Sequence, residues 1–90
     1  MSTSGKVIRE GILPAQIRAA RALIGLTQDD LASESGLPKR TIARIELAQV
    51  SPRASTLTAI RTALEAAGVE FIAENGHGPG VRLQKGNMMN

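Results

Sequence analysis

Residues 28–47, QDDLASESGLPKRTIARIEL, carry the clearest structural signal of this chain. Apolar residues recur at helical spacing on both sides of the middle, at Leu31, Leu37, Ile42 and Ile45. Gly36 lies between the two halves and supplies the backbone freedom of a tight turn. The small Ala32 lets two helices cross closely. The pattern therefore predicts two short helices joined by a tight turn, a helix-turn-helix.

Further helix signals precede and follow this turn. Pro14 suits a first helical turn and Gly25 a helix end, so a helix is expected between them. Its apolar face would consist of Leu13, Ile17, Ala20 and Ile24. Thr27 is the expected N-cap of the next helix, and Asp30 completes a variant of the capping box. Pro38 is expected to open the helix that follows the turn.

A fourth helix is expected after a loop over residues 48–54, with Ser55 as its N-cap and Gly68 at its end. Its apolar face would consist of Leu57, Ile60, Leu64 and Ala67. Strand-like residues at 69–72 and 81–83 then predict a β-hairpin with a long loop. Because an isolated hairpin is barely stable in water, it should pack on the helices or pair with the hairpin of a second subunit.

These elements give one small domain of the mainly α class. It is a bundle of four short helices that contains the helix-turn-helix, followed by a small C-terminal β-hairpin. Residues 1–12 are expected to form a flexible N-terminal arm and residues 13–68 the helix-turn-helix domain. The hairpin, residues 69–84, is a candidate dimerisation element, and residues 85–90 are expected to form a flexible tail.

Positive charge is concentrated at and after the second half of the helix-turn-helix. The chain of 90 residues has eleven Lys and Arg against eight Asp and Glu, a net charge of +3. Between residues 36 and 53 the charged residues are Lys39, Arg40, Arg44, Glu46 and Arg53. The positive excess of this window equals that of the whole chain. Such a patch is typical of nucleic-acid binders, although charge alone fits a solvated helix face about equally well.

Other kinds of chemistry have little support in the sequence. The chain has no Cys, which excludes disulfides and thiolate metal sites and favours a reducing compartment. The single histidine, His77, lies between two glycines in a predicted loop, so neither a metal site nor a catalytic base is expected. No apolar run approaches the roughly 20 residues that span a bilayer. We therefore expect a cytoplasmic protein that is not an enzyme, needs no cofactor and does not bind a membrane.

Two segments around the turn carry a family resemblance. TQDDLA at residues 27–32, Gly36 and TIARIE at residues 41–46 resemble the lambda-repressor-like, or XRE, class of phage-type regulators. The similarity covers roughly residues 17–68, and the ending at residues 68–83 resembles the tail of a bacterial subgroup of short XRE proteins. The resemblance implies double-stranded DNA as the partner, with the third helix in the major groove.

The resemblance also implies roles for individual residues. The expected DNA-binding residues are Gln28, Lys39, Arg40, Thr41, Arg44 and Arg53. Gln28 would bond a phosphate, and the three basic residues of the third helix would read bases, since Arg and Lys suit guanine O6 and N7. Thr41 and Arg53 are expected to contact the DNA backbone. Lys6 and Arg9 of the arm are weaker candidates for phosphate contacts.

A structural ion pair between Arg21 in the first helix and Glu46 late in the third is implied in the same way. It would hold the third helix against the first. The chain departs from the family pattern at two positions. Leu47 stands where a glycine usually ends the third helix, which leaves room for a longer helix, and Pro38 replaces the usual hydroxyl residue that caps it.

The sequence thus favours a sequence-specific DNA-binding regulator, a repressor that binds as a homodimer to an inverted repeat. An antitoxin that also represses its own operon is a close variant. The alternative is an XRE-like protein-binding module, an antiactivator or antitoxin that docks on a transcription factor or toxin. The hairpin, or the surface around Leu47 and Val50, could serve that contact. The basic third helix favours DNA binding, because a docking module has less need for it.

Overall fold

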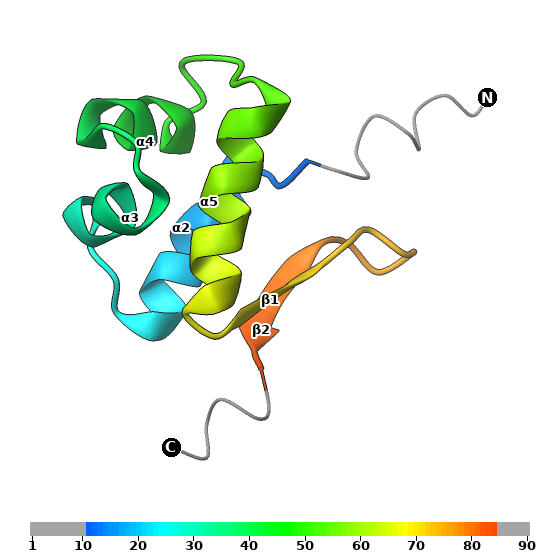
Figure 1. Ribbon diagram of the computed structural model, residues 1–90. Coiled ribbons are helices and arrows are strands. Elements are labelled where there is room, and N and C mark those ends of the chain that lie inside the picture. The colour runs from blue at the N-terminus through cyan, green and yellow to red at the C-terminus, as the bar shows by residue number, and fades with distance from the viewer. Residues whose placement is uncertain (1–10, 85–90) are drawn as a thin grey trace.

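The computed structural model describes residues 11–84. In this part of the chain, four helices precede two strands (Figure 1). The elements are α2 (Pro14–Ile24), α3 (Gln28–Ser35), α4 (Lys39–Glu46), α5 (Ala54–Ala66), β1 (Val69–Ile72) and β2 (Gly80–Leu83). None of these helices is both long and apolar enough to cross a membrane. The mainly α fold with a hairpin after the helices is confirmed, whereas Lys6 and Arg9 lie outside the described residues.

The side chain that caps helix α2 was not predicted from the sequence. Leu13 is its extended N-cap residue, and Gln16 Oε1 accepts a hydrogen bond from the Leu13 N–H at 2.8 Å. The prediction that Leu13 belongs to the buried face is wrong, because an extended N-cap residue lies off the helical face; Leu13 is 44% exposed. Ile17 and Ala20 are buried as predicted, and Gly25 ends the helix with φ 70°.

The turn between α3 and α4 is built from the residues that predicted it. Thr27 Oγ1 accepts a hydrogen bond from the Asp30 N–H, and Asp30 Oδ2 accepts one from the Thr27 N–H, both at 2.9 Å. Gly36 ends α3 with φ 75°, and its N–H donates to the Ala32 carbonyl at 2.9 Å. Pro38 is the extended N-cap residue of α4, which suits its fixed φ and its missing N–H.

Helix α4 ends without the extension for which the sequence left room. The helix ends at Glu46, and Ala48 adopts the left-handed conformation with φ 59°. The Ala48 N–H donates to the Ile45 carbonyl and the Gln49 N–H to the Arg44 carbonyl, both at 2.9 Å. This pair of bonds is a Schellman motif, so alanine occupies the position that usually holds glycine. The crowded Cβ of an L-residue in this conformation costs about 1–2 kcal/mol.

Helix α5 begins earlier than predicted. Its N-cap residue is Arg53, so the prediction that Ser55 caps the helix is wrong. Ser55 lies inside the first turn, because the first intrahelical hydrogen bonds end on the carbonyl of Arg53. The apolar face predicted for α5 is also wrong at its C-terminal end. Ala67 lies beyond the last helical residue and is exposed, and Ala63 is buried instead.

The hairpin closes within its own chain and packs on the helices. β1 and β2 pair antiparallel, with Phe71 opposite Val81, and both side chains pack against the core. Gln16 of α2 ties down the end of the hairpin, since its Nε2 donates to the carbonyls of Gly80 at 3.0 Å and Ile72 at 3.4 Å. The structure therefore realises the first of the two arrangements that the sequence left open, packing on the helices.

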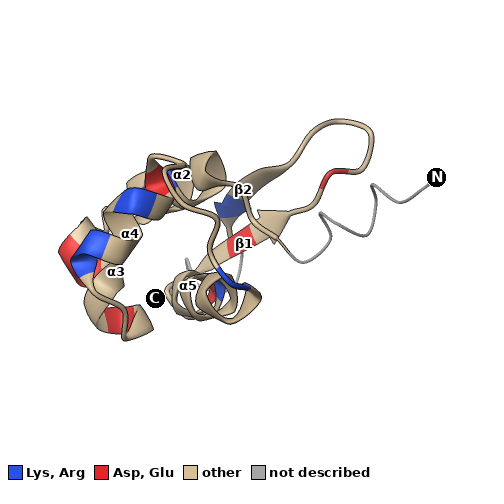
Figure 2. Cartoon of the chain, turned by 90° about the horizontal axis from the view of Figure 1, so that it is seen from above, with Lys and Arg blue, Asp and Glu red and all other residues tan. Residues whose placement is uncertain are grey.

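The core is aliphatic and joins the helices to the hairpin. Its buried members are Ile12, Ile17, Ala20, Leu31, Ile42, Ile45, Ile60, Ala63, Leu64 and Val69. Ile12, which stands at the end of the predicted arm, belongs to it. In both ribbon views α4 and the hairpin lie on opposite sides of the molecule, with α5 between them in Figure 1 (Figures 1 and 2). The outward side of α4 is therefore remote from the hairpin.

Candidate nucleic-acid interface

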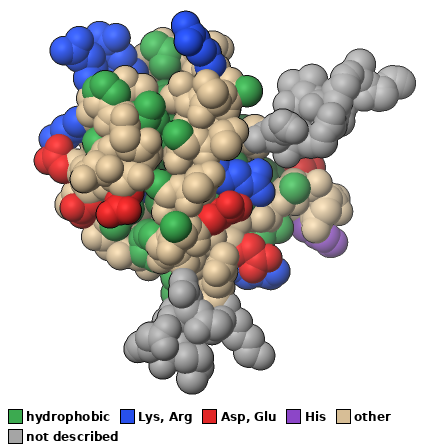
Figure 3. Space-filling view, viewed as in Figure 1, with side chains coloured by type: hydrophobic (Ala, Val, Ile, Leu, Met, Phe, Trp, Pro, Cys, Tyr) green, Lys and Arg blue, Asp and Glu red, His purple; other side chains and the backbone are tan. Residues whose placement is uncertain are grey.

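The outer face of α4 consists of Arg40, Ala43 and Arg44. At about 100° per residue, the two arginines fall opposite Ile42 and Ile45, which are buried in the core. Both arginines are exposed, so they point away from the domain. Figure 3 shows Lys and Arg side chains gathered at the end of the molecule where α4 and the start of α5 lie. This end of the fold presents a basic surface to solvent.

The basic residues of this surface are not equivalent. Lys39 Nζ lies 3.6 Å from Asp29 Oδ2 of α3, and these side chains are 57% and 72% exposed. Such an exposed pair contributes at most about 1 kcal/mol, but it draws Lys39 toward α3. Among residues 11–84, Arg40, Arg44 and Arg53 form no ion pair. Their guanidinium groups are therefore available to an anionic or hydrogen-bonding partner.

The C-terminal end of α4 is held by a group of three side chains, Arg21, Gln28 and Glu46, which we term the Glu46 network. Glu46 is 2% exposed. Its carboxylate accepts hydrogen bonds from Arg21 Nε at 2.7 Å and Arg21 Nη2 at 2.8 Å, and a third from Gln28 Nε2 at 3.0 Å. Arg18 Nη1 donates to the backbone carbonyl of Glu46. The ion pair implied by the family resemblance is thus present, and it links α2, α3 and α4.

The charge state of the Glu46 network follows from its geometry. Burial alone would raise the pKa of Glu46, because it disfavours a charged carboxylate. The hydrogen bonds from Arg21 and Gln28 and the positive charges of Arg21 and Arg18 outweigh burial, so the pKa of Glu46 is lowered. The hydrogen bond to Glu46 raises the pKa of Arg21 in turn. Glu46 is therefore ionised at neutral pH and adds little negative charge to the surface.

The remaining predicted site residues lie around α4. Gln28 is the first residue of α3, and one of its amide protons is used by Glu46, so that bond orients the side chain. Thr41 is half-buried on the flank of α4, and Arg53 stands at the start of α5. The structure thus places Lys39, Arg40, Thr41 and Arg44 on one short helix and brings Arg53 to the element that follows it.

Two contributors were not predicted from the sequence. Arg18 lies three residues before Arg21 and so shares its face of α2, a spacing that could have indicated its role. Asp29, an acidic residue in the first turn of α3, pairs with Lys39. No sequence signal marked that pair, because it depends on the angle at which α3 and α4 meet.

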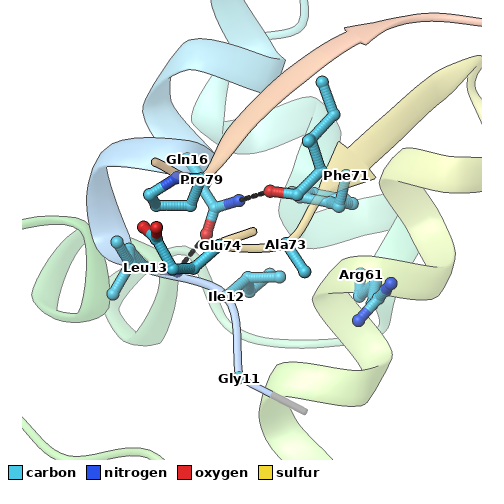
Figure 4. A pocket seen from close by; sticks show the side chains of 10 residues that line it. Gly11, Ile12, Leu13, Gln16, Arg61, Phe71, Ala73, Glu74 and Pro79 are labelled. Atoms are coloured by element: carbon cyan, nitrogen blue, oxygen red, sulfur yellow. Dashed lines mark hydrogen bonds between the residues drawn. The ribbon is translucent and has the colours of Figure 1, made fainter. Parts of the chain in front are cut away.

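A pocket of about 240 Å³ lies beside the hairpin, away from α4 (Figure 4). Most of its lining is apolar, from Ile12, Leu13, Phe71, Ile72, Ala73 and Pro79. Its polar side chains are engaged within the chain. Gln16 bonds the hairpin carbonyls, Arg61 bonds Glu65, and Glu74 Oε2 accepts hydrogen bonds from the backbone of the hairpin loop. The basic surface on α4 is therefore the stronger candidate for a functional site.

Comparison with known protein families matches residues 17–70 to a family described as helix-turn-helix. The matched segment begins in α2, contains the turn between α3 and α4, and ends in β1. It covers more than half of the chain. Comparison with curated proteins finds no match.

Proposed function

This chain belongs to the XRE-type helix-turn-helix family of DNA-binding regulators, which is not an enzyme family, and we propose that it represses transcription by placing α4 in the major groove. The observation that carries this proposal is the pair Arg40 and Arg44, exposed on the outer face of α4 and without ion-pair partners among residues 11–84. Guanidinium groups aimed outward from a recognition helix suit base edges and phosphates.

The Glu46 network supports this proposal by fixing the helix that would enter DNA. Arg21 and Gln28 bond the carboxylate at the C-terminal end of α4, so the helix is anchored to both α2 and α3. A recognition helix needs a fixed angle to the rest of the domain, because a small tilt moves its side chains across several base edges. Gln28 would also offer its second amide proton to a phosphate at the N-terminus of α3.

Binding to an inverted repeat would require two copies of the chain. We propose a homodimer that places its two α4 helices in successive major grooves, with half-site centres about 34–36 Å apart. The hairpin uses its Phe71 and Val81 side chains in its own core, so a dimer contact there would involve an outer strand edge. Sedimentation in the presence of an operator duplex tests this stoichiometry, and one chain per duplex would contradict it.

The test of DNA binding is fluorescence anisotropy with the duplex upstream of the gene for this chain, at two salt concentrations. We expect binding that weakens steeply with salt. Arg40→Ala and Arg44→Ala should each relax base preference, whereas Gln28→Ala should weaken all duplexes about equally. Arg82→Ala is the matched control, since Arg82 is an exposed arginine on the hairpin. No binding to any duplex near about 50 mM salt would refute the proposal.

One observation favours a second function, docking on another protein. Leu47 and Val50, which follow α4, are 65% and 44% exposed. Contiguous exposed apolar surface is typical of contact sites, and these two residues lie three positions apart in the chain. If docking on another protein were the main function, the double variant Leu47→Ser, Val50→Ser would abolish the regulatory activity of the chain in the cell and leave its DNA affinity unchanged. Loss of cellular activity in Arg40→Ala, with both apolar residues intact, would instead favour repression.

A further inference from the structure

The outer face of α4 carries few kinds of side chain that could read bases. Bases are distinguished in the major groove by particular side chains: Asn or Gln suits adenine, Glu or Asp suits cytosine, and Arg or Lys suits guanine. Helix α4, KRTIARIE, contains no Asn or Gln. Its only acidic residue, Glu46, is buried and bonded to Arg21. The base-reading donors that this face can present are therefore guanidinium groups.

The two arginines differ from the third basic residue of the helix. Lys39 is drawn toward α3 by Asp29, and an ammonium group binds as a point charge rather than through a planar fork. Arg40 and Arg44 are unpaired within residues 11–84 and can offer two parallel N–H donors each. Guanine presents O6 and N7 as a matching pair of acceptors.

The spacing of these arginines sets the spacing of their targets. They are four residues apart on one face, so their α-carbons are separated by about 6 Å along the helix axis. Successive base pairs are about 3.4 Å apart along the DNA axis, so this separation corresponds to about one to two base-pair steps, the larger value applying when α4 runs along that axis. Ala43, which is half-buried, flanks Arg40 on the helix and carries only a methyl group, so it does not hinder the approach of this face to the groove.

We propose that the half-site recognised by α4 contains two guanines one to two base pairs apart, one bound by Arg40 and the other by Arg44. This inference rests on the proposed DNA-binding function and specifies the operator class. Phosphate contacts by the same arginines are the competing arrangement. The two differ in a measurable way, because a phosphate contact carries no base preference, whereas a guanine contact depends on O6 and N7 and is strongest with the planar fork of arginine.

The first experiment selects duplexes from a random pool with the 90-residue chain. We expect the enriched half-site to contain the guanine pair at this spacing. Each guanine is then replaced by 7-deazaguanine, which keeps base pairing and lacks the N7 acceptor. Each replacement should weaken binding about 10-fold, at the lower end of what a bidentate contact contributes. Replacement of a guanine outside the pair should have no effect.

The second experiment uses charge-conserving variants. Arg40→Lys and Arg44→Lys should each weaken the preference for one of the two guanines, because lysine reaches O6 and N7 without a planar fork, and should leave the salt dependence of binding unchanged. Arg53→Lys is the control, because Arg53 lies outside α4 and should contribute no base preference. Arg40→Lys and Arg44→Lys variants that keep the full guanine preference of the parent chain would overturn the inference.

The selection also separates the inference from the function on which it rests. Enriched duplexes that bind specifically but lack the guanine pair would overturn the inference and leave DNA binding intact. Failure to bind any duplex near about 50 mM salt would refute the proposed function and the inference with it.

Discussion

The outer face of α4 and the Glu46 network lie on one helix and use the same kind of side chain in opposite ways. On the outer face, Arg40 and Arg44 are exposed and have no ion-pair partner among residues 11–84. In the network, Arg21 is largely buried and makes two hydrogen bonds to a carboxylate that is itself buried. Unpaired surface charge contributes little to folding, whereas a buried charge must be paired for the fold to persist.

This contrast separates Arg40 and Arg44 from Arg21. Substitutions in the Glu46 network should change the free energy of unfolding, because they leave a buried charge without its partner. Substitutions on the outer face should leave that free energy unchanged and alter DNA affinity instead. The role of each of these arginines is therefore assigned from its partners and its burial, and the predictions for Arg21 and Glu46 below test that assignment.

The largest effect is expected for Arg21→Ala. It leaves the Glu46 carboxylate buried with only Gln28 as a side-chain donor, which should lower the free energy of unfolding by about 3 kcal/mol. The midpoint of thermal unfolding, followed by circular dichroism, should fall by more than about 10 °C in a domain of this size. Arg40→Ala is the matched control and should change stability by less than about 0.5 kcal/mol. Equal midpoints for the two variants would contradict the division.

The next effect concerns pH. The pKa of Glu46 is lowered by folding, so its ionised form stabilises the fold above the ordinary carboxylate pKa of about 4.3. That stabilisation should be lost as the pH falls through the pKa of the folded state. Urea unfolding at a series of pH values from neutral downward measures it.

The matched variants for the pH series are Glu46→Gln and Glu70→Gln. Glu46→Gln should flatten the acid side of the profile. It should not abolish the slope, because the pKa values of Asp30 and Glu70 are also lowered. Glu70→Gln should have the smaller influence, since its pair with Arg82 is exposed. A Glu46→Gln profile parallel to that of the parent chain would show that Glu46 does not titrate as proposed.

Local signals in the sequence were sufficient for most of the helix boundaries. Thr27, Asp30 and Gly36 predicted the limits of α3 because caps and left-handed glycines act within four residues. The Arg21–Glu46 pair came from family resemblance, since periodicity alone places each residue on its helix without naming a partner. The guanidinium-rich outer face of α4 followed from spacing, because Ile42 and Ile45 fix which side is buried.

Features that depend on contacts between distant segments could not be predicted in this way. Gln16 is buried because its amide joins α2 to carbonyls 56 and 64 residues further along the chain. The Lys39–Asp29 pair depends on the angle between two helices. The left-handed Ala48 is a third case, since an alanine gives no sign that its φ is positive. In each case the tertiary structure overrides the local preference.

A smaller effect, this time a gain in stability, is expected for Ala48→Gly. Glycine adopts the left-handed conformation of this Schellman position without strain, although it also loses more backbone entropy on folding. The net gain should be about 0.5–1 kcal/mol, measured by urea unfolding. Ala43→Gly is the control, because residue 43 is helical and glycine there should cost about 1 kcal/mol. A loss of stability in both variants would show that the strain at Ala48 is relieved elsewhere.

The smallest effect is expected for Asp29→Asn, which tests how far Lys39 belongs to the outer face of α4. The substitution releases Lys39 from its 3.6 Å contact and removes a negative charge beside Gln28, the expected phosphate-binding residue. DNA affinity should rise about two- to three-fold at low salt, because exposed charges interact weakly in water. The gain should shrink as salt is added, since screening reduces such interactions beyond about 10 Å at 0.1 M ionic strength.

The control for Asp29→Asn is Glu34→Gln, which removes the same charge from the last turn of α3. Glu34 is exposed and forms no ion pair among the described residues. Its substitution reports the effect of net charge alone, so the difference between the two variants measures the local effect of Asp29, namely its pair with Lys39 together with its charge beside Gln28. If Asp29→Asn and Glu34→Gln raise affinity equally at every salt concentration, the Lys39–Asp29 pair has no part in tuning the interface, and Lys39 acts beside Arg40 and Arg44 as freely as they do.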